Sequence, residues 1–346
     1  MKLAIIGGAG VRTPLLVHGL TRSDVPIGEI SLFDPDADRL SLIAPLAARM
    51  AEGARVTAAP SLEASLDGAS FVFTSIRVGG IEGRARDEQT SLAHGIVGQE
   101  TVGPGGFAMA MRTIPHIVRY ARAVEAHAPD AWIINFTNPV GIVTQAVRTA
   151  TGARIIGICD TPTELFEEIA HALGLPASEC FFDYFGLNHL GWVREVFHRG
   201  RPQLAALFED PARLALVYRT PLFDPRFLQA LRLLPTEYVY YYYRAKEAYE
   251  NVRRAGSSRG RVIQGLNDQL FRDLAAGGAD TGAVYEHYLA ARNAGYMQIE
   301  SGSGAREPAP WSALTGYDKI ALSVLRAMRH NSNAIIPLNV TNDGNI

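Results

Sequence analysis

The alternation of short apolar runs with amphipathic segments in the first half of the chain predicts an α/β fold with a doubly wound parallel sheet. Runs of β-branched or aromatic residues occupy positions 3–6, 30–33, 71–76, 132–136 and 154–158. Helical patterns separate several of these runs, at positions 40–52, 114–127 and 140–149. Continuously apolar strands separated by helices indicate a parallel sheet covered on both faces, whose ligands bind at the carboxyl ends of the strands. A Rossmann-type domain is therefore expected.

The pattern changes near position 181, which predicts a second, mainly helical α+β domain. Positions 181–185 and 192–197 are predicted antiparallel strands on either side of the segment GLNHLG. Helical patterns follow at 226–233, 238–254, 262–276 and 281–294, and positions 300–310 have the Gly, Ser and Pro content of a loop. We therefore expect one domain over residues 1–180 and a second over residues 181–346.

Composition excludes several classes of protein. Lys and Arg number 33 against 35 Asp and Glu, giving a formal net charge of −2, so the basic excess of a nucleic-acid binder is missing. Two cysteines in 346 residues form no disulfide framework, which favours a reducing, cytoplasmic location. No apolar stretch reaches the roughly 18 residues of a membrane span, and no membrane partner is expected.

The segment after the first strand has features of a dinucleotide site. Gly8 and Gly10 occupy the first two glycine positions of the fingerprint, whereas Thr13 stands at the third, which is a departure. Asp34, at the end of the second predicted strand, suits an adenosine ribose and disfavours a 2′-phosphate, so NAD is preferred over NADP. The alternative is a tight strand–helix turn that binds no ligand.

Three further segments carry unusual chemistry. The first, RVGGIEGRARDE, contains Arg77, Arg84 and Arg86 directly after a central strand, and GQETVGPGGF follows it. Exposed arginines in a solvated loop are common, but a phosphate-bearing ligand at this edge of the sheet would favour a bidentate guanidinium such as Arg84.

The second set comprises NFTNP, GICDTP and GLNHLG, where Cys159 lies at a strand tip and His189 lies in a Gly-bounded turn. Such residues are usually a buried thiol and a hydrogen-bonded bystander. A thiolate and an imidazole also make half of a coordination shell, which substrate oxygens and water would complete around a divalent metal. The third segment, PTEYVYYYY, holds five tyrosines, and spacing does not single out one as a base.

Together these motifs, in this order and spacing, resemble glycoside hydrolase family 4, the NAD- and divalent-metal-dependent glycosidases, and most closely its 6-phospho-β-glucosidase branch. The resemblance implies that Cys159 and His189 bind the metal, usually Mn²⁺, and that Tyr238 is the catalytic base. Asp160 matches the proton donor of the α-glucosidase branch, which leaves the anomeric preference open. The resemblance places Arg84, Asn138, Arg259 and, we expect, Asn188 at the substrate; Arg259 and Arg261 are the expected ligands of its 6-phosphate.

The implied reaction is redox-assisted hydrolysis: C3 oxidation by NAD⁺, C2 deprotonation, elimination of the aglycone, addition of water and re-reduction. The alternatives are a 6-phospho-α-glucosidase, a plain NAD-dependent hydroxy-acid dehydrogenase, and a non-catalytic NAD- or sugar-phosphate-binding protein. Family chains usually continue beyond NVTNDG, so we expect a second domain that is short relative to the family. A homo-oligomer, dimer or tetramer, is implied as well.

Overall fold

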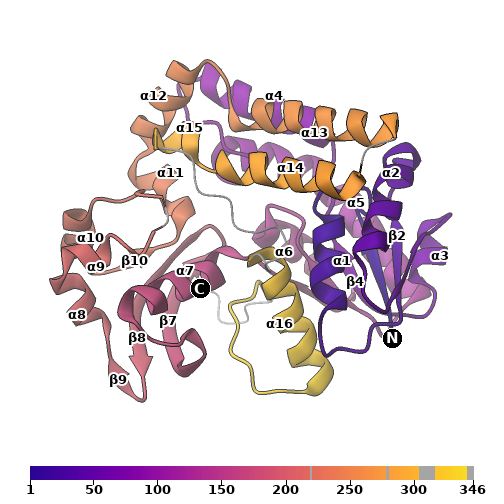
Figure 1. Cartoon of the computed structure of the whole chain (residues 1–346), viewed down its shortest axis with the longest axis horizontal. Helices are drawn as coiled ribbons and strands as arrows, with labels where there is room; N and C mark the ends of the chain where they lie inside the picture. Colours follow the sequence, from indigo (N-terminus) through magenta and orange to yellow (C-terminus); the bar gives the residue numbers. More distant parts are fainter. Residues whose placement is uncertain (219, 278–279, 304–315, 341–346) are drawn as a thin grey trace.

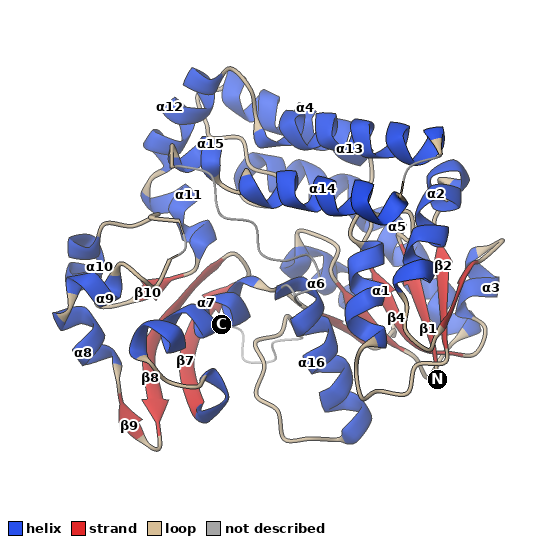
Figure 2. Cartoon of the chain, in the orientation of Figure 1, coloured by secondary structure: helices blue, strands red, loops and turns tan. Residues whose placement is uncertain are grey.

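A computed structural model describes residues 1–218, 220–277, 280–303 and 316–340. The first half of the chain forms a six-stranded parallel sheet in the order β3-β2-β1-β4-β5-β6 (Figure 2). Its strands are β1 (Lys2–Ile6), β2 (Glu29–Phe33), β3 (Arg55–Ala58), β4 (Ala69–Thr74), β5 (Trp132–Asn135) and β6 (Ile155–Gly157). This order confirms the predicted doubly wound fold, and the direction of winding reverses beside β1, where such sheets bind their ligands.

Both faces of this sheet are buried, which explains its unbroken apolar strands. Leu3 and Ile5 of β1 belong to one buried cluster, whereas Ala4 and Ile6 belong to another on the opposite face. The first cluster includes residues of α1 (Thr13–Thr21) and α2 (Ala37–Met50). The second includes residues of α3 (Leu62–Leu66), α5 (Gly103–His127) and α6 (Val140–Ala150).

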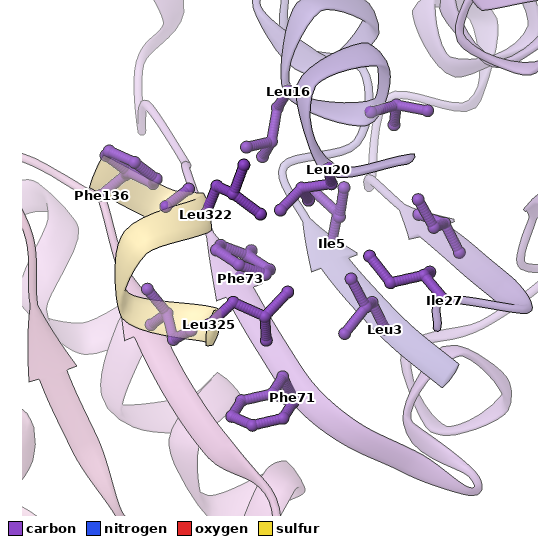
Figure 3. Close-up of a cluster of buried hydrophobic side chains, with 14 of the residues drawn as sticks. Leu3, Ile5, Leu16, Leu20, Ile27, Phe71, Phe73, Phe136, Leu322 and Leu325 are labelled. Atoms are coloured by element: carbon purple, nitrogen blue, oxygen red, sulfur yellow. The ribbon is translucent and has the colours of Figure 1, made fainter. Parts of the chain in front are cut away.

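The first cluster is completed by a helix from the far end of the chain. Helix α16 (Gly316–His330) contacts α1 and buries Leu322 and Leu325 in the cluster that holds Phe71 and Phe73 (Figure 3). Tyr317 at its start stacks on Phe136, with ring centroids 3.9 Å apart. The last helix therefore packs against the first sheet, although the sequence assigns its residues to the second domain; the division at residue 180 stays a prediction.

The second half contains a small antiparallel sheet and short helices. The hairpin of β7 (Cys180–Leu187) and β8 (Leu190–His198) confirms the two predicted strands, and β9 (Arg201–Pro202) and β10 (Leu234–Pro235) pair with β8. A separate hydrophobic cluster joins this sheet to α7 (Thr161–Leu173) and to the following helices. These are α8 (Leu204–Glu209), α9 (Pro211–Leu214), α10 (Pro225–Leu231), α11 (Tyr240–Tyr243) and α12 (Ala245–Ala255).

Two long helices of the second half extend back over the first. Helices α13 (Arg259–Ala276) and α14 (Thr281–Ala294) run side by side along the top of Figure 1, followed by the short α15 (Gln298–Ser301). They share a buried cluster with α2, and α13 also packs on α4 (Gly80–Ala93). This arrangement covers the carboxyl edge of the parallel sheet. In the described part of the chain, no helix combines the length and apolarity needed to cross a bilayer.

Several predicted boundaries are wrong for identifiable reasons. The arginine-rich segment is not an open loop, because α4 begins at Gly80. The helix predicted over 114–127 begins earlier, at Gly103, where Pro104 suits the first helical turn. Gly105 lies in this turn because a side chain there would lie 2.2 Å from the carbonyl oxygen of Gln99. The helix predicted over 238–254 is interrupted at Arg244. Of the loop predicted over 300–310, residues 300–301 are helical and residues 304–310 lie outside the described residues.

Candidate active site

A cleft of about 1520 Å³ lies along the carboxyl ends of the parallel strands. One end is formed by the glycine-rich loop after β1 and by the residues that follow β2. The other is formed by the loops after β5 and β6, by the tip of the β7–β8 hairpin and by the tyrosine-rich segment, while α13 and α14 line one side. The cleft thus brings together nearly all the segments that the sequence singles out.

The glycine-rich loop is held tightly against the sheet. The amides of Gly7 and Gly8 both donate to the carbonyl oxygen of Phe33, at 2.9 Å. Gly7 has a φ of 94°, and a side chain there would lie 2.2 Å from the Ser75 carbonyl oxygen, so glycine is required. Gly10 and Thr13 line the cleft as predicted, but Gly8 lies against β2 and fixes the loop without lining the cleft.

Asp34 lies beside this loop. One of its carboxylate oxygens accepts from the Ala9 amide at 3.2 Å, and the other accepts from the Asp36 amide at 3.0 Å. Burial raises the pKa of Asp34, and these two hydrogen bonds oppose that effect. The carboxylate lines the cleft where the winding of the sheet reverses, which is where the fold places an adenosine ribose.

Cys159 follows β6 at the start of α7 and is 8% exposed. Burial, followed by the negative charge of Asp160, raises the pKa of its thiol to about 12, although Asn188 and Thr161 hydrogen-bond to it and oppose the shift. Asn188 therefore lies beside the thiol, at the tip of the hairpin. The thiol is protonated at neutral pH, and a bound cation is needed to make it a thiolate.

His189 occupies the hairpin turn with a φ of 60° and is 6% exposed. Its Nδ1 lies 3.0 Å from Thr101 Oγ1, and that hydroxyl in turn donates to Gln99 Oε1. Because the single hydroxyl proton of Thr101 is used there, Nδ1 must be the donor to Thr101, which leaves the Nε2 lone pair free to bind a metal. Burial lowers the pKa of His189 to about 4, against the effect of Glu100, so the ring is neutral at pH 7.

Tyr238 is stacked on His189, with ring centroids 3.8 Å apart and the planes inclined by 3°. Its hydroxyl hydrogen-bonds with Tyr296, whose own hydroxyl donates to Glu237. Burial raises the pKa of Tyr238 well above its usual range, and the carboxylates of Glu237 and Glu100 raise it further. The phenol is therefore protonated at neutral pH, and a nearby cation is needed for its phenolate to form.

Asp160 lies on the same part of the cleft and faces Arg12, with 4.0 Å between Oδ2 and Nη1. The guanidinium of Arg12 lies 5.1 Å from the ring centroid of Tyr317 in α16. Asp160 is thus an accessible carboxylate close to the thiol and the phenol, as a proton donor must be.

The predicted substrate ligands fall into two groups. Arg84 and Asn138 line the cleft, and the buried side-chain oxygen of Asn138 has no hydrogen-bond partner among the described residues, so it has hydrogen-bonding capacity for a ligand. Arg259 is 8% exposed behind the cleft wall and donates to the Arg292 carbonyl oxygen at 2.5 Å. Arg261 is exposed and bonds to Gln264 and Gln89, which directs it away from the cleft.

Sequence reasoning missed several polar residues of the cleft. Glu100 bridges Arg77 at 2.5 Å and Arg84 at 2.7 Å; burial alone would raise its pKa, but these two arginines and Arg292 lower it to about 2. Gln99 and Thr101, in the same GQET segment, fix the His189 ring. The sequence marked the GQET segment as a motif but gave no role to its individual residues.

The fold and the cleft together define a Rossmann-fold enzyme whose cleft is lined by a glycine-rich loop and by a carboxylate, a phenol, a thiol and an imidazole. The chain belongs to glycoside hydrolase family 4: the profile of the family 4 glycosyl hydrolases matches residues 2–175, and that of their C-terminal domain matches residues 184–346. This assignment confirms the family resemblance seen in the sequence.

Relatives of the chain include proteins named 6-phospho-β-glucosidases and others named 6-phospho-α-glucosidases. A probable 6-phospho-beta-glucosidase of Bacillus subtilis is 31% identical over 100% of this chain and 77% of its own length. A 6-phospho-beta-glucosidase of Escherichia coli is 36% identical over 78% of this chain, which spans 64% of that relative. The structure of the 6-phospho-beta glucosidase from Thermotoga maritima with manganese, NAD⁺ and glucose-6-phosphate has 30% identity and a TM-score of 0.72, over 84% of this chain and 72% of that one.

Proposed function

We propose that this chain hydrolyses 6-phospho-β-glucosides with NAD⁺ and a divalent metal, Mn²⁺ in the first instance, as cofactors. The observation that carries the proposal is the stack of Tyr238 on His189 in the cleft that also contains Cys159 and the glycine-rich loop. A simple hydroxy-acid dehydrogenase needs no thiol, imidazole and phenol grouped in this way. The names and bound ligands of the relatives support the same substrate class.

The residues present fit a dinucleotide. The amino end of α1 faces the cleft, where the positive end of its helix dipole and the close backbone approach at Gly10 suit a pyrophosphate. Asp34 is placed to accept from the hydroxyls of an adenosine ribose, and its negative charge disfavours a 2′-phosphate.

The residues also fit half of a metal shell. Cys159 and His189 supply one sulfur and one nitrogen donor, and the described residues contain no group of three or more His, Cys, Asp or Glu side chains arranged for a metal. Substrate oxygens and water would therefore complete the coordination, which ties metal binding to substrate binding.

The chain's own residues then account for the proton transfers. Bound NAD⁺ supplies a hydride acceptor for C3 and the divalent metal supplies a Lewis acid, which together acidify the hydrogen on C2. Tyr238 takes that proton at its phenolic oxygen. Asp160 donates a proton to the departing oxygen at C1, while Arg84 and Asn138 hold the sugar. Water then adds at C1 and gives its proton to Asp160, Tyr238 returns its proton to C2, and the hydride taken from C3 would return to C3 from the reduced dinucleotide.

Hydrolysis of α-linked substrates is the second candidate function, and Asp160 is the observation that favours it. The family resemblance associates an aspartate at this position with the α-glucosidase branch, and here its carboxylate lines the cleft beside Arg12. Both candidates share the cofactors, the base and the sequence of proton transfers, so they differ only in the linkage that fits the cleft.

A panel of α- and β-linked 6-phosphoglycosides, assayed with and without NAD⁺ and Mn²⁺, tests the proposal. We expect cleavage of the β-linked aryl substrate only when both cofactors are present, without accumulation of NADH. Preferential cleavage of the α-linked substrate would select the second candidate. Hydrolysis that persists after removal of NAD⁺ and chelation of metal, or stoichiometric NADH formation from a hydroxy acid, would contradict the proposed chemistry.

Metal binding should release about one proton at neutral pH. The metal-free thiol of Cys159, with a pKa near 12, must lose its proton, whereas His189, with a pKa near 4, is already neutral. Between pH 6 and 8 the Mn²⁺ affinity should therefore rise about tenfold per pH unit. Calorimetric titration in buffers of different ionisation enthalpy measures the released proton; affinity independent of pH would exclude the thiol as a ligand.

We further propose a cytoplasmic homo-oligomer, dimer or tetramer. Both cysteines are free, which suits a reducing compartment. Strand β7 forms the edge of its sheet and exposes Phe181, Phe185 and Leu187, a combination typical of surfaces that a partner covers.

A further inference from the structure

The cations that line the cleft differ in how they are neutralised. Five of them lie within 4.0 Å of a carboxylate: Arg12 with Asp160, Arg39 with Asp36, Arg77 and Arg84 with Glu100, and Lys319 with Glu167. Arg292, near the end of α14, is the exception in the described part of the chain, where it forms no ion pair.

Neutral groups hold Arg292 in place. Its Nη1 donates to the Tyr288 hydroxyl at 3.0 Å, and that hydroxyl donates to Asn267 Oδ1 at 2.8 Å, which links α14 to α13. The carbonyl oxygen of Arg292 accepts from Arg259. A guanidinium has five N–H donors, and Arg292 uses one of them within the described residues. The side chain is therefore fixed in position while most of its donors remain available.

Burial and two like charges act on the guanidinium of Arg292. Burial and the like charges of Arg12 and Arg84 lower its pKa, against the effect of Tyr288. A half-buried cation without a counter-ion is costly, and a bound anion removes that cost. A phosphate dianion matches the planar fork of a guanidinium better than a carboxylate of the protein would.

We propose that Arg292 is the principal ligand of the 6-phosphate of the sugar. The inference rests on the proposed function and replaces both expected ligands: Arg259 is buried behind the cleft wall, and Arg261 lies on the outer surface. The pyrophosphate of the dinucleotide is the other phosphate in reach. The sugar is favoured because Arg292 acts electrostatically on Glu100, and because α14 leads directly to Tyr296, which hydrogen-bonds with Tyr238. Arg292 therefore lies at the catalytic end of the cleft.

Calorimetric binding of glucose 6-phosphate, glucose and NAD⁺ to the Mn²⁺-loaded protein tests this assignment without relying on turnover. Arg292→Gln should weaken glucose 6-phosphate binding about 10- to 100-fold, the range for loss of a charged hydrogen bond. Glucose and NAD⁺ binding should remain within about twofold of the unsubstituted protein, which also shows that the variant is folded. Arg292→Lys should fall between the two, because it keeps the charge but loses the fork.

Two further variants sharpen the test. Arg272→Gln, on the exposed side of α13, is the matched control and should bind all three ligands normally. Arg261→Gln represents the competing assignment. Loss of NAD⁺ binding in Arg292→Gln would assign the arginine to the pyrophosphate. Loss of glucose 6-phosphate binding in Arg261→Gln alone would make Arg261 the ligand of the 6-phosphate. Either result overturns the proposal, as would equal affinity of the unsubstituted protein for glucose and glucose 6-phosphate. Failure of the proposed function would instead appear as intact glucose 6-phosphate binding without NAD⁺-dependent hydrolysis.

Discussion

Tyr238→Phe should reduce hydrolysis of a 6-phospho-β-glucoside by about 10²- to 10⁴-fold, the usual contribution of a positioned base. The variant removes only the phenolic oxygen. The ring that stacks on His189 at 3.8 Å is retained, so NAD⁺ and metal affinity should change little. Exchange of the C2 hydrogen with deuterium from solvent should fall by the same factor as hydrolysis, because both depend on proton removal by this oxygen.

Tyr243→Phe is the matched control. This tyrosine belongs to the same segment, but it is 41% exposed and packs against Phe227. Removal of the Tyr243 hydroxyl should leave the rates of both hydrolysis and C2 hydrogen exchange unchanged. If Tyr238→Phe also kept normal C2 exchange, the base would have to be another group of the cleft.

The expected size of this effect follows from the charges around Tyr238. Burial, Glu237 and Glu100 all raise its pKa, so the phenolate is strongly basic once formed. Those same groups keep the phenol protonated in the metal-free protein. Because the phenolate forms only when a cation lowers the pKa of Tyr238, proton abstraction is confined to the loaded enzyme.

The local pattern of the sequence was sufficient to predict the parallel sheet. Strand β1 supplies Leu3 and Ile5 to one face and Ala4 and Ile6 to the other, so its apolar run has no polar alternation. Helix α4 and the first part of α5 were missed because glycines at their starts have the composition of a loop. Glycine is needed at position 105 because the backbone of Gln99 packs closely against it, and composition does not reveal such a tertiary contact.

The site was predictable only in part, because its residues depend on long-range packing. Cys159 and His189 were marked by their motifs, and both line the cleft. Arg259 and Arg261 lie two positions apart at the start of α13, yet one is buried behind the cleft wall and the other faces solvent. Arg292 lies in no recognisable sequence motif. It is singled out as a candidate anion ligand only by comparison with the other cations of the cleft, each of which lies near a carboxylate.

Cys159→Ser should weaken Mn²⁺ binding and lower NAD⁺-dependent hydrolysis by at least about 100-fold, since even the loss of an outer-shell partner costs 10- to 100-fold. Serine has nearly the same size, and Asn188 and Thr161 still provide its hydrogen-bonding environment. A hydroxyl is a far weaker acid than a thiol, however, and gives no anionic sulfur to a borderline metal. Metal titration and initial rates over a range of Mn²⁺ concentrations measure the two losses together.

The second thiol of the chain provides the control for this substitution. Cys180 begins β7, where its sulfur donates to the Pro176 carbonyl oxygen at 3.5 Å, and it is not among the residues that line the cleft. Cys180→Ser should therefore keep both metal affinity and rate. Because the two variants make the same chemical change, a loss confined to position 159 reports coordination rather than general sensitivity to thiol removal. Normal Mn²⁺ dependence in Cys159→Ser would exclude the thiol as a ligand and place the metal elsewhere.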